Sequence, residues 1–182
     1  MDLILDPARI GNSPWLYTMM KKLLFIFLVY HPVLASEAVV YTLGDNLKAV
    51  FSCSPQFTVV QAGVTGYYCT DEESLITYTV GIVPVGKIED SEIESHLNAF
   101  IEGDEKALDG KTTYKSMGMI GSNRGAYFII KFRYQGYPGT KYAAVIYGND
   151  HFYQWAIQDI QGLSKVDGVS IFNKYIQYFS VE

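Results

Sequence analysis

The chain has 182 residues and a formal net charge of −5, which is long enough for one domain with a real core but not clearly for two. The acidic balance argues against a general nucleic-acid binder, because such proteins normally carry a basic patch. The sequence contains no phosphate-binding loop, dinucleotide fingerprint or cluster of metal ligands, so we expect neither a cofactor nor a metal.

An export signal is predicted near the start of the chain. Met20-Lys21-Lys22 precedes an apolar run, and small residues follow near Ala35, which is the plan of a secretory signal peptide. We interpret residues 20–35 as this signal, with cleavage before Ser36 or, alternatively, after Ala38. The alternative readings are an uncleaved anchor or a buried segment, although the apolar run is short for a membrane span.

The signal does not start the chain, which is unusual for such a segment. We interpret residues 1–19 as an upstream extension from a start codon assigned too early. Residues 36–182 then form a single α+β domain, which we expect in the periplasm or outside the cell, with no membrane span in the mature form.

The first half of this domain predicts strands followed by a helix. Strands are expected at residues 39–41, 47–53, 66–69 and 75–83. Ser91 and Glu94 have the spacing of a capping box. After them, Ile93, Leu97, Phe100 and Ile101 fall on one helical face, and Gly110 is the expected stop.

Residues 111–160 predict an antiparallel meander, because four strand-like segments are separated by short turns. The strands are expected at residues 112–120, 127–134, 142–147 and 152–157, with turns at residues 121–125, 136–139 and 148–150. In the segment 127–134, alternation places one apolar set against a core and the other, which becomes charged, on a partly covered face. The first set is Phe128, Ile130, Phe132 and Tyr134; the second is Tyr127, Ile129, Lys131 and Arg133.

A last helix is expected after Ser164, a candidate cap, with Asp167 three residues later. Its apolar face comprises Val169, Phe172, Ile176 and Phe179. Separate blocks of strands and helices are typical of an α+β fold. We therefore expect a mainly antiparallel sheet flanked by two helices.

Cys53 and Cys69 are the only cysteines. An even count in an exported protein favours a disulfide, and two buried free thiols are the alternative. They do not form a CxxC redox pair, and a zinc site would need further ligands.

Catalytic constellations are weak in this sequence. His31 lies in the signal, His96 on the predicted helix and His151 in a turn beside Asp150. The Asp150–His151 pair could serve a small secreted hydrolase, but no serine occupies a nucleophile elbow. The acidic clusters 71–73 and 104–105 lack the spacing of a calcium loop, and we interpret them as solvated surface.

Aromatic side chains are the remaining candidates for a binding site. They gather in the last two turns of the meander and in the strands beside them. Exposed tyrosines near an arginine suit a protein or ligand interface, although tyrosines also line cores with their hydroxyls at the rim. The candidate binding residues are Arg133, Tyr134, Tyr137 and Tyr153.

Several of these segments resemble small exported bacterial proteins with the PsbP-like fold. The resemblance covers about residues 47–181 and rests on a few short patterns and an aromatic C-terminal helix. The patterns are residues 51–55, 78–80, 136–139 and 147–154. It implies an α/β/α sandwich and a binding or assembly role without catalysis.

The favoured function is accordingly an exported, non-enzymatic binding or assembly module of the bacterial envelope. Its partner would be a protein or a small apolar ligand. The alternatives are the secreted hydrolase and an immunity or chaperone protein that masks a secreted effector.

Overall fold

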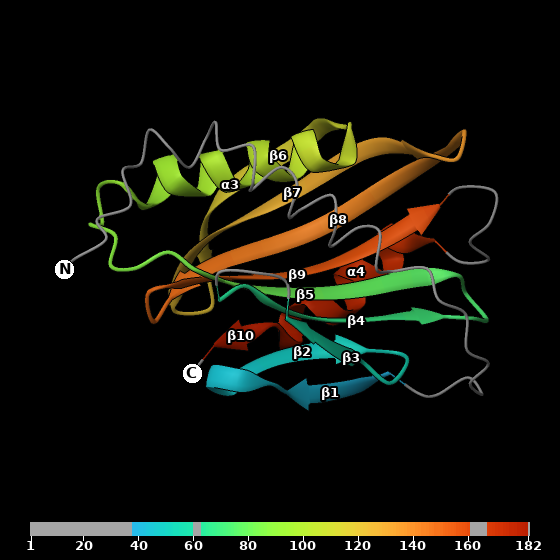
Figure 1. Ribbon diagram of the computed structural model, residues 1–182, viewed down its shortest axis with the longest axis horizontal. Helices are drawn as coiled ribbons and strands as arrows, with labels where there is room; N and C mark the ends of the chain where they lie inside the picture. The colour runs from blue at the N-terminus through green and yellow to red at the C-terminus, as the bar shows by residue number, and fades with distance from the viewer. Residues whose placement is uncertain (1–37, 60–62, 161–166, 182) are drawn as a thin grey trace.

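The structure, a computed structural model, describes residues 38–59, 63–160 and 167–181 (Figure 1). The predicted extension, the predicted signal and the candidate cap Ser164 lie outside the described residues.

The described strands form two antiparallel sheets. The smaller has the order β1-β2-β10, from Val39–Thr42, Leu47–Phe51 and Ser180–Val181. The larger has the order β3-β4-β5-β9-β8-β7-β6. Its strands, in chain order, are Gln56–Val59, Thr65–Asp71, Ile76–Pro84, Lys111–Ile120, Asn123–Tyr134, Tyr137–Gly148 and His151–Ile160.

Within the described ranges, two α-helices accompany the sheets, α3 over Ile93–Leu108 and α4 over Gly168–Tyr175. Short 3-10 turns occur at Gly44–Asn46 and Ile176–Tyr178. The expected α+β class with a mainly antiparallel sheet is confirmed. Strands β3 and β10 were not predicted, and β10 has only two residues, too few to show a period of its own.

The meander β6–β9 forms as expected, but its central turn lies earlier than predicted. The turn between β7 and β8 consists of Gln135 and Gly136, both with positive φ, and Tyr137 already pairs with Tyr134. Pro138 therefore lies inside a strand. It is tolerated there because β8 pairs with β9 only from Gly139 onward, so the missing N–H removes no bond from that ladder.

The larger sheet buries both of its faces in part, against different elements (Figure 1). On one, the α3 face, helix α3 packs against β6 and β7. On the other, the α4 face, helix α4 packs against β8 and β9, and the smaller sheet covers the neighbouring strands. Full burial of each large apolar side chain contributes about 1.5–3 kcal/mol, so both faces contribute to stability.

Trp155 is the centre of the α4 face and is fully buried. Its indole Nε1 donates to the Val50 carbonyl of the smaller sheet at 3.0 Å. Its ring stacks on Phe172 of α4, with 5.4 Å between centroids. One side chain thus connects both sheets and the last helix.

The start and end of α3 differ slightly from the prediction. The N-cap is Glu92, whose side chain makes no capping hydrogen bond, so the N-cap is not Ser91 and the predicted capping box of Ser91 and Glu94 does not form. The C-cap is Asp109 in the left-handed region, one residue before the expected stop at Gly110. A Cβ on Gly110 would lie 2.8 Å from the Lys131 carbonyl oxygen, so close packing on β7 favours glycine there.

A buried polar network holds α3 on its face of the sheet. The Lys141 ammonium donates to both carboxylate oxygens of Asp104, at 2.8 and 2.6 Å, and to the Gln154 Oε1 at 3.1 Å. Gln154 Nε2 donates to Asp104 at 3.0 Å. Asp104 and Lys141 are only 2% and 4% exposed. The expectation that residues 104–105 are solvated surface is therefore wrong for Asp104, because β8 supplies a cation that no local pattern reveals.

Two glycines that face each other across β6 and β7 differ in the space that surrounds them. Gly118 and Gly125 lie directly opposite each other on β6 and β7. A Cβ on Gly125 would lie 2.5 Å from a backbone carbonyl oxygen of β8, whereas a Cβ on Gly118 meets nothing within 4 Å. Only the inner strand of this pair lacks room for a side chain.

Candidate functional site

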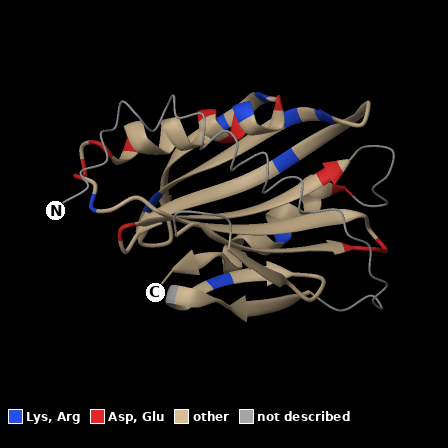
Figure 2. Cartoon of the chain, in the orientation of Figure 1, with Lys and Arg blue, Asp and Glu red and all other residues tan. Residues whose placement is uncertain are grey.

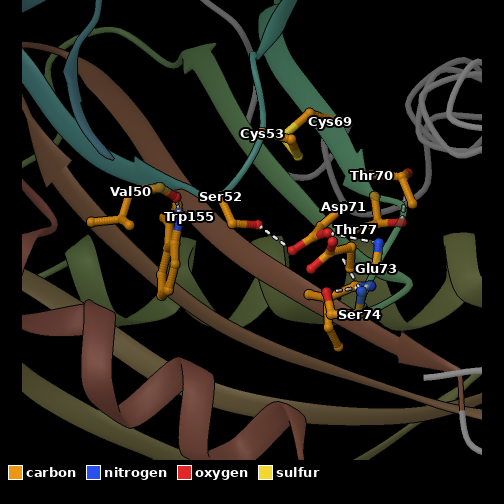
Figure 3. The surroundings of a disulfide bond; sticks show 11 residues. Val50, Ser52, Cys53, Cys69, Thr70, Asp71, Glu73, Ser74, Thr77 and Trp155 are labelled. Atoms are coloured by element: carbon orange, nitrogen blue, oxygen red, sulfur yellow. Dashed lines mark hydrogen bonds between the residues drawn. A yellow bond between two sulfur atoms is a disulfide. The ribbon is translucent and has the colours of Figure 1, made fainter. Parts of the chain in front are cut away.

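The two cysteines form a disulfide, as the even count favoured (Figure 3). Their Cα atoms lie 5.9 Å apart, and the bond joins the segment after β2 to β4. Ser52 Oγ donates to Asp71 Oδ2 at 2.9 Å beside it, and Asp71 Oδ1 accepts from the Glu73 amide at 2.9 Å. This corner therefore ties the smaller sheet to the larger one and has a structural role.

Three of the four predicted binding residues lie together at the β7–β8 hairpin. Tyr134 and Tyr137 are direct cross-strand partners, and Arg133 lies opposite Pro138. Tyr137 is 46% exposed. Arg133 donates to the Gly136 carbonyl at 3.3 Å, so its guanidinium is held near the turn. A binding role for this hairpin stays a prediction.

Tyr153 does not join that group. It lies opposite Ile146 of β8 and Ile82 of β5, far along the strands from the hairpin. Its side chain is fully buried in the core of the α4 face. In this conformation it cannot contact a surface partner, because the packing of the smaller sheet and α4 decides its burial.

Asp150 and His151 have separate partners. The His151 Nδ1 lies 2.6 Å from the Asn149 carbonyl oxygen. Asp150 Oδ1 accepts from the Tyr147 hydroxyl at 3.4 Å. These contacts fasten the β8–β9 turn and do not form the dyad that the hydrolase alternative requires.

A groove of about 340 Å³ opens on the α4 face, between α4 and strands β6–β8. Its lining is mainly aromatic and aliphatic and includes Tyr114, Tyr127, Ile129, Tyr142, Val169, Phe172, Asn173 and Ile176. It exists because α4 covers β8 and β9 but leaves the outer strands partly open. Tyr114, on the outermost strand, is 53% exposed.

The two faces of β7 that the alternation in residues 127–134 predicted agree with the structure. Phe128, Ile130 and Phe132 are buried on the α3 face. Tyr127 and Ile129 are half-buried on the opposite face, where they line the groove, and Lys131 is exposed. The partly covered face was expected from the sequence, whereas the wall that α4 supplies was not.

The register orders the groove face into rows across the sheet. Tyr114, Ile129 and Tyr142 are successive cross-strand neighbours and form an apolar row. The next row comprises Lys111, Lys131 and Thr140. Side chains in one row lie about 5 Å apart, and adjacent rows on one face about 7 Å apart. An apolar floor thus borders directly on two lysines.

Burial and nearby charges raise the pKa of two tyrosines that line the groove. Burial raises the pKa of Tyr127. Burial, and then the negative charges of Asp159 and Asp167, raise the pKa of Tyr142. Both hydroxyls therefore stay protonated at neutral pH and act as neutral hydrogen-bonding groups.

The two acids belong to the start of α4. Asp167 caps the helix by accepting from the Val169 amide at 3.3 Å. Asp159 Oδ2 accepts from the Gly168 amide at 3.2 Å, while its buried Oδ1 has no hydrogen-bond partner among the residues that the structure describes. Negative charge at a helix N-terminus is stabilising. The acids therefore mark the α4 end of the row that begins with Lys111.

Sequence reasoning missed most of the groove. Tyr114 and Asn173 stand in segments with no motif. Tyr142 is half-buried and was not among the predicted binding residues. The usable signal was the alternation in residues 127–134, which marks one face as incompletely covered.

Comparison with known proteins adds little beyond this geometry. No known protein family matches the chain, and no curated protein matches it. Neither helix in the described ranges is long and apolar enough to cross a membrane. Among solved structures, the chain is similar to PA94 of Pseudomonas aeruginosa, a protein of unknown function provisionally described as a regulator, with 9% identity and a TM-score of 0.47 over 76% of this chain and 90% of that one.

Proposed function

We propose that the chain is an exported, non-enzymatic binding module of the bacterial envelope, and that its groove takes an apolar ligand or an apolar segment of a partner. The observation that carries the proposal is the groove itself. It is concave, its lining is mainly apolar, and a few polar groups border it, which is the usual composition of a ligand site.

Two further features support the compartment and the fold. A structural disulfide is typical of oxidising compartments, and the signal-like segment at residues 20–35 agrees with export. Helices α3 and α4 pack on opposite faces of the larger sheet. This arrangement favours the α/β/α sandwich that the PsbP-like resemblance implies.

Binding of a neutral apolar probe tests the function. We expect the protein to bind decan-1-ol, with NMR shifts that map to the residues lining the groove. The variant Val169→Glu adds a charge to the groove wall at an exposed site of α4, and it should abolish this binding. Val40→Glu, at an exposed site of the smaller sheet, is the matched control and should bind normally.

The result that refutes the proposal is a wild-type protein with no shifts in the groove, or equal binding by the two glutamate variants. Export is tested separately by the mass of the protein recovered from the periplasm or medium. A mature form that retains Met20 would exclude processing of the predicted signal.

A further inference from the structure

We infer that the groove ligand is a small amphipathic carboxylate, with its apolar body along the Tyr114–Ile129–Tyr142 row and its anionic head at Lys111 and Lys131. This inference rests on the proposed function, because it names the ligand class of the same groove.

The lysine pair carries the inference. Lys111 and Lys131 lie directly opposite each other on β6 and β7, on the same face of the sheet. Like charges in this position destabilise an antiparallel pair. In the part of the chain that the structure describes, no carboxylate pairs with either ammonium. An anion placed between them would relieve the repulsion and gain two charge-assisted contacts.

The spacing of the two rows fits one molecule. The two rows are two residues apart on β7 and β8 and three residues apart on β6, where the ladder has a bulge between Thr112 and Tyr114. On β7 the side chains of the two rows therefore lie about 7 Å apart along the strand. Arg133 follows Lys131 on the same face by a further two residues. Figure 2 shows that basic residues are present on the outer strands β6 and β7. A ligand whose body fills the groove therefore reaches the lysines with its head.

The acidic residues at the start of α4 determine which end of the lysine row can hold the anionic head of the ligand. Asp159 lies in the row of Lys131, beyond Thr140, about 10 Å away across two strand spacings. Asp167 caps the same helix. Their charges disfavour an anionic head at the α4 end of the row and leave the β6–β7 end as its place. A cationic head would instead prefer the α4 end of the row, and the comparison of decanoate with decylamine below distinguishes the two cases.

The size of the groove limits the ligand. At about 340 Å³ it is near the lower end of ligand pockets. This volume suits a single short acyl or aromatic body rather than a lipid with two long chains.

Calorimetry with a matched set of probes tests the inference. Decanoate has both an apolar body and an anionic head, whereas decan-1-ol has the apolar body without a charge. Decylamine has the same body with a positive charge, and butyrate has the negative charge with only a short apolar body. At low salt we expect decanoate to bind at least fivefold more tightly than decan-1-ol, with decylamine weaker and butyrate undetectable. Added salt should weaken only the decanoate complex towards the value for decan-1-ol.

Charge variants locate the head. Lys131→Gln and Lys111→Gln should each weaken decanoate binding roughly fivefold, as for a partly exposed ion pair, and leave decan-1-ol binding unchanged. Lys131→Arg should restore the affinity. Arg124→Gln is the control, because Arg124 is exposed on β7 but faces the opposite side of the sheet. It should bind decanoate normally.

The outcomes separate this inference from the proposed function. If decan-1-ol binds as tightly as decanoate and the lysine variants change nothing, the head site is wrong and the apolar groove stands. Tighter binding of decylamine would likewise overturn the anionic ligand. If no probe binds the folded wild-type protein, both the inference and the proposed function fail.

Discussion

Removing one partner from the buried Lys141–Asp104–Gln154 network should destabilise the protein severely. Lys141→Met leaves the Asp104 carboxylate buried, with the Gln154 amide as its one remaining donor among the described residues. Asp104→Leu leaves the ammonium buried beside Gln154 Oε1. Loss of one member of a buried ion pair costs about 3–5 kcal/mol, which is a large part of the ~5–15 kcal/mol that stabilises a typical domain.

The double variant should recover most of that loss. With Asp104→Leu and Lys141→Met together no charge remains in this network, and replacing a buried pair by apolar side chains is often close to neutral. The remaining cost is that of the Gln154 amide without partners, about 1–3 kcal/mol. The two single costs, together about 6–10 kcal/mol, should therefore exceed the cost of the double variant by several kcal/mol.

Urea unfolding of the oxidised protein, followed by far-UV circular dichroism at neutral pH, measures these costs. With a slope of about 2 kcal/mol per molar urea, a loss of 4 kcal/mol shifts the midpoint by about 2 M. Lys115→Met is the matched control. Lys115 also reaches α3, with its ammonium 2.6 Å from Asn98 Oδ1, but at an exposed site, so it should cost at most about 0.5 kcal/mol. The reasoning is refuted if Lys141→Met costs no more than Lys115→Met, or if the single costs add in the double variant.

Three further predictions concern stability. Reduction of the Cys53–Cys69 bond, whose cysteines are 16 residues apart, should lower the free energy of unfolding by about 3 kcal/mol, measured in urea with and without reductant. Gly125→Ala should cost about 1–3 kcal/mol because its Cβ overlaps β8, whereas Gly118→Ala should be neutral or slightly stabilising. Burial raises the pKa of Tyr78 from 10.0 to about 12, so the folded state keeps the proton longer than the unfolded chain. Stability is then fully present below pH ~10 and falls by about 1.4 kcal/mol per pH unit up to pH ~12.

Each of these has its own control. A variant with both cysteines changed to serine should show no response to reductant. Equal costs for the two glycine variants would mean that the crowding at β7 is relieved by backbone movement. Tyr78→Phe should remove the alkaline loss, while Tyr114→Phe at an exposed site should leave it unchanged; a loss that persists in Tyr78→Phe would assign it to other groups.

The sequence by itself determined the local features with a strong period. Alternation in residues 127–134 specified β7 and its two unlike faces, since side chains in a strand point alternately to opposite sides. The apolar stripe specified α3 although its cap was assigned wrongly. The even cysteine count favoured the disulfide that the structure contains.

Only the tertiary structure decided which distant residues meet. Asp104 and Lys141 are 37 residues apart, and their charges carry no sign in the sequence that they are buried together. Tyr153 lies in the core rather than at the surface because the smaller sheet and α4 close over β9. The groove arises because the pairing of β5 with β9 fixes the strand order, and α4 is short enough to leave β6 and β7 partly open. Strand order and helix placement depend on packing between segments far apart in the chain, and no local pattern encodes them.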